Sequence, residues 1–188
     1  MIGYLFDLID RMFKNMPDIL FETENIQLRP IVESDFNALK TIWADPEVMY
    51  YSIAGIQTDE QIRERILKSK KEYLIDGMGR WSVILKNTNQ LIGECGISAQ
   101  EVGDQLEYEI GYRFAKPCWG KGYATQAATC CRELGFGKFG LQRLISIIDP
   151  KNQASIRVAE KIGMIKEKEF LFHNIPVLLY NLDKDEED

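Results

Sequence analysis

The chain has 188 residues, 45% of them hydrophobic, which is typical of one soluble globular domain with a sizeable core. Its net charge of −6 and its pI near 5.0 argue against nonspecific nucleic-acid binding and suit a cationic or amine-bearing substrate better. No stretch approaches the roughly 20 apolar residues that span a bilayer, so we expect no membrane partner.

Apolar residues at helical spacing predict an amphipathic helix over residues 1–16. This segment has no basic leader and carries two aspartates, so it differs from a signal peptide. We expect it to pack on the domain or across a homodimer, with contact to a membrane surface as the alternative. A single domain is expected over residues 20–183, followed by a solvated acidic tail over residues 184–188.

The first half of the domain contains one expected strand, two helices and a hairpin. In chain order these elements are expected at residues 26–31, 33–44, 58–76, 80–86 and 91–98. Thr58 and Gln61 fit a capping box for the second helix, and Gly77 is a typical end signal. The polar run 87–90 predicts the turn of the hairpin.

The second half alternates strands and helices. In chain order these elements are expected at residues 105–114, 124–139, 144–149, 153–161, 165–172 and 177–182. The order β α α β β β α β α β β predicts an α/β fold. We expect a mixed, mostly antiparallel sheet of six to seven strands with helices on both faces.

The run Trp119-Gly120-Lys121-Gly122-Tyr123-Ala124 lies between a predicted strand and a predicted helix. Two glycines there allow the backbone to approach a ligand closely, and the first helical turn offers unpaired amides. This combination predicts a phosphate or pyrophosphate site. A second glycine run over residues 135–140 lies at the end of the helical pattern, where it indicates helix termination.

Cysteine and histidine usage gives little support for a metal site. None of the four cysteines forms a C-x-x-C pair, and His173 is the only histidine, so zinc is not expected. We expect a reduced, cytoplasmic protein. His173 is interpreted as a surface residue at a strand turn rather than as a catalyst.

Three segments together resemble the GNAT superfamily of acetyl-CoA-dependent N-acetyltransferases, and within it the RimJ/RimL-like branch. They are Tyr108-Glu109-Ile110-Gly111-Tyr112, the glycine run extended to Thr125, and residues 149–163 from Asp149-Pro150 to Ile162-Gly163. The resemblance covers residues 26–183. It implies acetyl-CoA as donor substrate, no metal, and an amine acceptor such as a protein N-terminal α-amine or a small-molecule amine.

The resemblance also implies a set of CoA contacts. The pantetheine arm would pair with the backbone of β-strand residues, and the pyrophosphate would bind the amides of the glycine run. The implied CoA-binding residues are Ile110, Gly111, Tyr112, Trp119, Gly120, Lys121, Gly122, Tyr123, Ala124 and Asn152. A backbone amide of the same strand would polarise the thioester carbonyl.

Two positions depart from the family pattern. Pro117 occupies a position where Gln or Arg is frequent, and Ala159 occupies the position of a tyrosine general acid. Ser155, one helical turn earlier, is the matching hydroxyl in this branch. We hypothesise that Ser155 protonates the departing thiolate, directly or through water; the alternative is that Ser155 only caps its helix.

A protonated acceptor amine needs a base, and the candidates are Glu94, Glu107 and Glu109. Strand alternation places Glu107 and Glu109 on one face of their strand. We expect Glu109 and Glu94 in catalysis and Glu107 in acceptor binding, with ion pairs to Arg113 or Arg80 as the alternative. Tyr50 and Tyr51 lie in a region from which the family builds acceptor specificity.

Three alternatives remain at this level. The acceptor could be a polyamine or an aminoglycoside rather than a protein N-terminus. Ala159 favours a CoA-binding sensor or interaction module that lost turnover, and a non-CoA phosphate binder is the third possibility. An acyl-enzyme on Cys118 is disfavoured, because the resemblance implies direct transfer.

Overall fold

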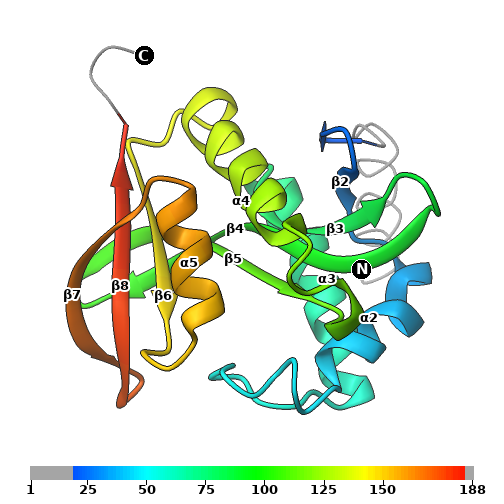
Figure 1. Cartoon of the computed structure of the whole chain (residues 1–188), viewed down its shortest axis with the longest axis horizontal. Helices are drawn as coiled ribbons and strands as arrows, with labels where there is room; N and C mark the ends of the chain where they lie inside the picture. The colour runs from blue at the N-terminus through cyan, green and yellow to red at the C-terminus, as the bar shows by residue number, and fades with distance from the viewer. Residues whose placement is uncertain (1–18, 185–188) are drawn as a thin grey trace, which may run out of the picture.

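The computed structural model describes residues 19–184 (Figure 1). The helix predicted over residues 1–16 and the part of the predicted tail beyond residue 184 lie outside the described residues. Within them one sheet is built from the following strands: β1 (Phe21–Glu22), β2 (Ile26–Pro30), β3 (Gly79–Leu85), β4 (Gln90–Val102), β5 (Gln105–Phe114), β6 (Arg143–Ile148), β7 (Ile165–Phe172) and β8 (Ile175–Asp183).

The helices form where the capping signals predict them. They are α2 (Phe36–Trp43), α3 (Asp59–Ile75), α4 (Tyr123–Glu133) and α5 (Gln153–Lys161). Thr58 and Gln61 form the expected capping box of α3, and Gly77 has φ of +78° just after its end. The helix predicted to reach residue 139 ends its α-helical part at Glu133 and continues as a π-helical turn, Leu134–Lys138.

The sheet order is β1-β2-β3-β4-β5-β6-β8-β7, and every neighbouring pair is antiparallel except β5 and β6. This confirms the predicted mixed, mostly antiparallel sheet with helices on both faces. The described residues contain eight strands rather than six to seven, because the two-residue β1 adds an edge pair to β2. Two residues are too few to produce a period that a sequence pattern can show.

The helices cover the two faces of the sheet in pairs, and Figure 1 shows α4 and α5 together on the face toward the viewer. On this side Ile97, Ile110 and Leu144 belong to one buried cluster with Ala127 and Ala128 of α4. A second cluster packs α2 and α3 under the opposite face. Its buried members are Ile31, Leu39, Ile42, Trp43, Met49, Ile62 and Ile66.

β5 and β6 meet at one register position only, Glu109 opposite Ile145. Ser146 adds a side-chain bond to the carbonyl oxygen of Ile110, with a donor–acceptor distance of 2.8 Å. Beyond this point the two parallel strands diverge, as Figure 1 shows for β5 and β6. Residues 111–114 therefore pair with β4 on one side, while their other edge has no partner strand among the described residues.

Candidate functional site

A cavity of about 630 Å³ lies where β5 and β6 diverge. We call it the central cavity, and its walls come from both halves of the sheet and from the helices around them. They include residues 50–54 of the loop after α2, residues 109–113 of β5, residues 146–149 at the end of β6, Asn152 and Ser155. The opening between the strands thus places backbone, hydroxyl and carboxylate groups around one space.

The glycine run forms the entrance to α4. Gly120 and Gly122 have φ of +71° and +81°, and Gly122 is the N-cap residue of the helix. The amide of Gln126 is the first to bond within the helical pattern, to the carbonyl oxygen of Gly122. The amides of residues 120–125 have no hydrogen-bond partner within residues 19–184, so the positive end of the helix dipole is open to an anion.

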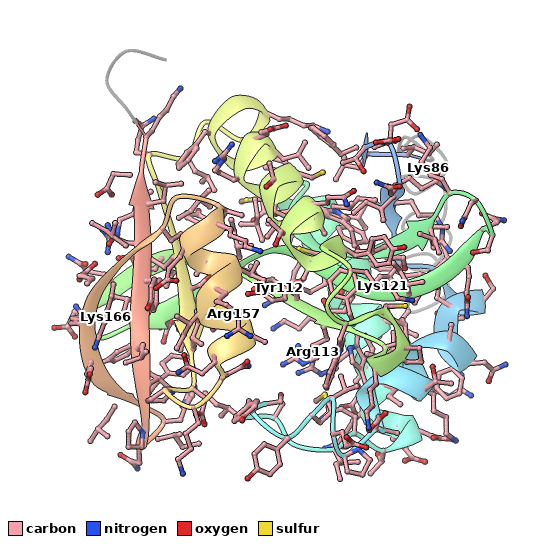
Figure 2. All side chains as sticks on the ribbon, in the orientation of Figure 1. Lys86, Tyr112, Arg113, Lys121, Arg157 and Lys166 are labelled. Atoms are coloured by element: carbon pink, nitrogen blue, oxygen red, sulfur yellow. The ribbon has the colours of Figure 1, made fainter. Side chains whose placement is uncertain are left out.

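Side chains beside this run fix its position rather than add charge to it. The indole Nε1 of Trp119 donates to the carbonyl oxygen of Phe114 at 2.8 Å, which ties the run to the end of β5. Lys116 pairs with Glu47 at 2.6 Å. Lys121 is exposed, and Figure 2 shows it beside the start of α4.

The glycine run lies outside the wall of the central cavity, whereas the predicted β5 residues lie in it. Residues 111–114 connect the two places, and their free edge runs from the cavity toward Trp119. The carbonyl oxygen of Ile110 is already bonded to Ser146, so the free edge begins after that atom. An elongated ligand could therefore follow β5 from the cavity to the N-terminus of α4.

The Arg80 guanidinium occupies the space that a side chain at position 111 would need, which favours glycine there although its φ is not positive. A Cβ at Gly111 would lie 1.9 Å from Nη1 of Arg80, so the guanidinium lies across the strand at this residue. Arg80 is held there by Glu109 and Ser98, each at 3.2 Å from its Nη2. Burial lowers the pKa of Arg80, but the carboxylates of Glu94 and Glu109 outweigh it and raise the pKa above its usual value.

The start of α5 places the Ser155 side chain in the cavity wall. Asn152 Oδ1 caps the helix by accepting from the amide of Ser155 at 3.1 Å, so the cap is Asn152 and not Ser155. The Ser155 side chain lies within hydrogen-bonding reach of the Tyr112 phenol. Tyr112 donates its phenolic proton to the carbonyl oxygen of Ser155 at 3.1 Å, and burial raises the pKa of Tyr112.

The three predicted carboxylates have three different environments. Glu109 lines the cavity, and its Oε2 accepts from Arg80 at 3.2 Å and from Gln100 at 3.0 Å. Glu94 has 0% exposure and pairs with Arg113 at 3.1 Å, while its Oε2 has no partner in the described structure. Glu94 is absent from the cavity wall, and its catalytic role stays a prediction.

Glu107 has an ion-pair partner on the neighbouring strand. It shares a face of β5 with Glu109, as alternation predicted, but its carboxylate pairs with Arg143 of β6 at 3.1 Å. Glu107 and Arg143 lie in a separate, shallower hollow and not in the central cavity. Alternation predicts which face of a strand a residue occupies, but it does not show where along the strand the neighbouring strand diverges. Acceptor binding by Glu107 stays a prediction.

Some aromatic residues near the site are exposed and others are buried. Tyr50 and Tyr51 line the cavity with ring centroids 4.9 Å apart, and the exposed His173 lies at its rim. Trp43 and Trp81 are buried in the two cores. Cys118 lies outside the cavity wall, and burial raises the pKa of its thiol, which disfavours a nucleophilic thiolate.

Comparison with known proteins decides the family. The model of the acetyltransferase (GNAT) domain matches residues 25–165. An uncharacterized protein of Bacillus subtilis (strain 168), YkkB, is 39% identical over 84% of this chain and 92% of its own length. The uncharacterized N-acetyltransferase p20 of Bacillus licheniformis is 32% identical, over 77% of this chain and 82% of its own.

A solved structure agrees with this assignment. The crystal structure of a GNAT-family acetyltransferase from Bacillus anthracis is 30% identical and covers 86% of this chain and 96% of its own, with a TM-score of 0.74. The chain belongs to the GNAT acetyltransferase family. It is an acyltransferase, and acetyl-CoA is its donor substrate.

Three arginines of this acetyltransferase site, Arg65, Arg80 and Arg113, were not singled out as site residues by sequence reasoning. All three line the cavity, although Arg80 and Arg113 were considered only as ion-pair partners. The side-chain role of Tyr112 was also missed, because only its backbone was implied. Among residues 19–184, no group of three or more His, Cys, Asp or Glu side chains could hold a metal ion, and no helix is long and apolar enough to cross a membrane.

We expect that Gly120→Ala and Gly122→Ala each weaken CoA binding at least tenfold. Positive φ disfavours an L-residue by roughly 1 kcal/mol, and relaxation of the run would turn its free amides away from an anion. Isothermal titration with CoA measures the effect. Gly103→Ala is the matched control, since Gly103 has φ of +63° and equally open surroundings in the β4–β5 turn. Unchanged CoA affinity in both variants of the run would contradict the assignment of the site.

Proposed function

We propose that this chain is an acetyl-CoA-dependent N-acetyltransferase of the RimJ/RimL-like type that acetylates a primary amine by direct attack on the thioester. The observation that carries the proposal is the free edge of β5. It joins the anion-binding amides at α4 to a cavity that contains both Glu109 and Ser155. The glycine run would hold the pyrophosphate, and β5 the pantetheine arm.

The donor would be held mainly by backbone groups. Amides of residues 120–124 would bind the pyrophosphate, and the backbone of Tyr112, which faces away from β4, would pair with the pantetheine arm as an added strand would. Asn152 lines the cavity and uses only its Oδ1 for capping, which leaves Nδ2 for the thioester end of the arm. A backbone amide of β5 would polarise the thioester carbonyl, a contribution of a few kcal/mol in other acyl transfers.

Glu109 is the carboxylate that can act as base on an acceptor in the cavity. Its Oε2 is held by Arg80 and Gln100, which leaves Oε1 without a hydrogen-bond partner in the described residues. An acceptor amine is mostly protonated at neutral pH, with a pKa near 8 for an α-amine and near 10 for a lysine. Glu109 would take that proton directly or through a water molecule.

Ser155 would complete the reaction on the other face of the sheet. Glu109 contacts β3 and β4 residues, whereas Ser155 lies at the start of α5, and both reach the cavity through the gap between β5 and β6. The amine nitrogen forms a bond to the thioester carbon, and the carbon–sulfur bond breaks. Glu109 would take the proton that makes the amine neutral before it attacks. As the carbon–sulfur bond breaks, the nitrogen loses its second proton, and the Ser155 hydroxyl would relay a proton to the CoA thiolate, giving one proton and receiving another, directly or through water.

The identity of the acceptor is a finer proposal. A RimL structure, named for acetylation of the ribosomal L7/L12 α-amine, shares the fold at 17% identity with a TM-score of 0.75, which supports the fold alone. Assignment to the RimJ/RimL-like branch therefore rests on the sequence motifs at residues 108–112, 119–125 and 149–163. One observation favours a sensor without turnover, because Ala159, in the position of the family's tyrosine, is buried in the core.

The function is tested by following thiol release from acetyl-CoA with a panel of peptide α-amines, lysine-like amines, polyamines and aminoglycosides. We expect steady, amine-dependent release that continues over many turnovers. A control without amine separates transfer from thioester hydrolysis. CoA binding without turnover on any acceptor would contradict the enzyme and favour the sensor.

We expect Glu109→Gln to lower kcat/KM about 100-fold at pH 7, and to lower it much less above the pKa of the acceptor amine. The amine then loses its proton to solvent and no longer needs a base. A pH–rate profile with one acceptor measures this, and Glu101→Gln, an exposed residue of β4, is the control. A loss that is the same at every pH would mean that Glu109 only holds Arg80 in place.

We expect Ser155→Ala to lower kcat at least tenfold with little change in the KM for acetyl-CoA, because the hydroxyl is needed when the thiolate leaves. Ser155→Thr should restore part of the rate. Thermal melting of both variants checks that Asn152 still caps α5. Unchanged turnover in Ser155→Ala would remove Ser155 from the mechanism.

A further inference from the structure

The central cavity is lined by four cationic side chains: Arg65, Lys68, Arg80 and Arg113. Three of its cations have a carboxylate partner: Lys68 with Glu72 at 3.5 Å, Arg80 with Glu109 at 3.2 Å, and Arg113 with Glu94 at 3.1 Å. Arg65 lines the same cavity and forms no ion pair within residues 19–184. The guanidinium of Arg65 therefore has no bonded carboxylate, and Asp149, the cavity-lining carboxylate at the end of β6, also forms no ion pair within these residues.

Arg65 is held in place by neutral groups. Its Nε donates to Oε1 of Gln57 at 3.1 Å, and its guanidinium carbon lies 5.5 Å from the ring centroid of Trp43. Gln57 is itself buried and donates to the carbonyl oxygens of Ala54 and Gly55, so the support is rigid. The two Nη atoms have no partner in the described residues, which leaves the end of the guanidinium group for a ligand.

The surroundings of Arg65 disfavour its charge. Burial lowers the pKa of Arg65, and the nearby Arg113 and Arg80 lower it further, while Glu94 compensates only in part. Arginine stays protonated in proteins despite such shifts. A bound anion would relieve the repulsion and would be bound with two parallel hydrogen bonds, the geometry that guanidinium and carboxylate groups share.

We propose that the acceptor amine belongs to a molecule that also carries a carboxylate, and that this carboxylate pairs with Arg65. The inference rests on the proposed function, since it names the class of acceptor for the same site. Glu109 would receive the amine, and Arg65 would bind the acid of the same molecule. Both residues line the cavity on the side of the sheet covered by α3.

Arg80 and Arg113 thus make the surroundings of Arg65 positive, whereas the whole chain has a net charge of −6. A polyamine or an aminoglycoside would bring several positive charges next to Arg65, Arg80 and Arg113. The carboxylates Glu94 and Glu109 are already bonded to two of these arginines. A polycationic acceptor would therefore meet repulsion beside Arg65, and the cavity-lining carboxylate that forms no ion pair within residues 19–184 is Asp149, at the end of β6.

The first experiment compares acceptors that differ only in one charge. Two tripeptide amides, Ala-Asp-Gly and Ala-Asn-Gly, have the same terminal amine, and free amino acids with their amides form the small-molecule arm. We expect kcat/KM to be at least tenfold higher for the acid in one arm or both, and the arm with the larger ratio identifies the source of the carboxylate. Equal use of acid and amide in both arms, or a preference for spermidine, would overturn the inference while leaving the proposed function intact.

The second experiment assigns the preference to Arg65. Arg65→Gln should reduce kcat/KM for the preferred acid at least tenfold and leave the neutral partner nearly unchanged, while Arg65→Lys should retain part of the preference. Arg63→Gln is the matched control, because Arg63 lies on the same helix over the ring of Phe36 and outside the cavity. A preference that survives Arg65→Gln would overturn the assignment.

A binding measurement keeps the inference testable without turnover. Isothermal titration of CoA-loaded wild-type protein with N-acetylated Ala-Asp-Gly amide and its Asn counterpart should show at least tenfold tighter binding of the acidic peptide if the peptide arm is preferred, and N-acetyl amino acids with their amides serve the other arm. If no amine supports thiol release, the proposed function fails. Equal binding of acid and amide in both arms overturns the inference separately.

Discussion

The site depends on the early separation of two parallel strands. β5 and β6 pair at Glu109 and Ile145 and then diverge, so one edge of residues 111–114 has no partner strand within residues 19–184. Unpaired backbone groups in a folded protein need water or a ligand, which makes this edge a place for an extended molecule that carries its own amides. The same separation opens the sheet, so groups that belong to opposite faces reach one cavity.

The charged side chains inside this opening are stabilised by ion pairs with one another rather than by contact with water. Glu94 is fully buried, and it is tolerated because Arg113 bonds to it and Arg80 and Arg65 lie near. Removing one partner of such a group generally costs several kcal/mol, because the remaining charge stays buried. The cluster therefore also stabilises the structure. Glu94 contributes to this stabilisation, whereas Glu109 faces the cavity.

Local signals predicted much of this molecule. Periodicity and φ preference are properties of residues that are close together in the sequence. They predicted the strands of the sheet, the capping box at Thr58 and the glycine run at α4. The partners of Glu94, Glu107 and Glu109 depend on register between strands, which one sequence does not show. Arg65 was missed because its helical spacing on α3 resembles that of any polar face, and only the packing of α3 beside β3 brings it to the cavity.

Arg113 connects the buried Glu94 of the sheet to the loop after α2, two parts of the site that could otherwise change independently. One of its nitrogens bonds to Glu94 beneath the sheet, and the other donates to the Ser52 hydroxyl in the loop that carries Tyr50 and Tyr51. A loop transplanted from a relative with a different residue at position 52 would release one end of this side chain. New acceptor preferences in this scaffold thus require paired changes in the loop and in β5, rather than exchange of the loop as an independent cassette.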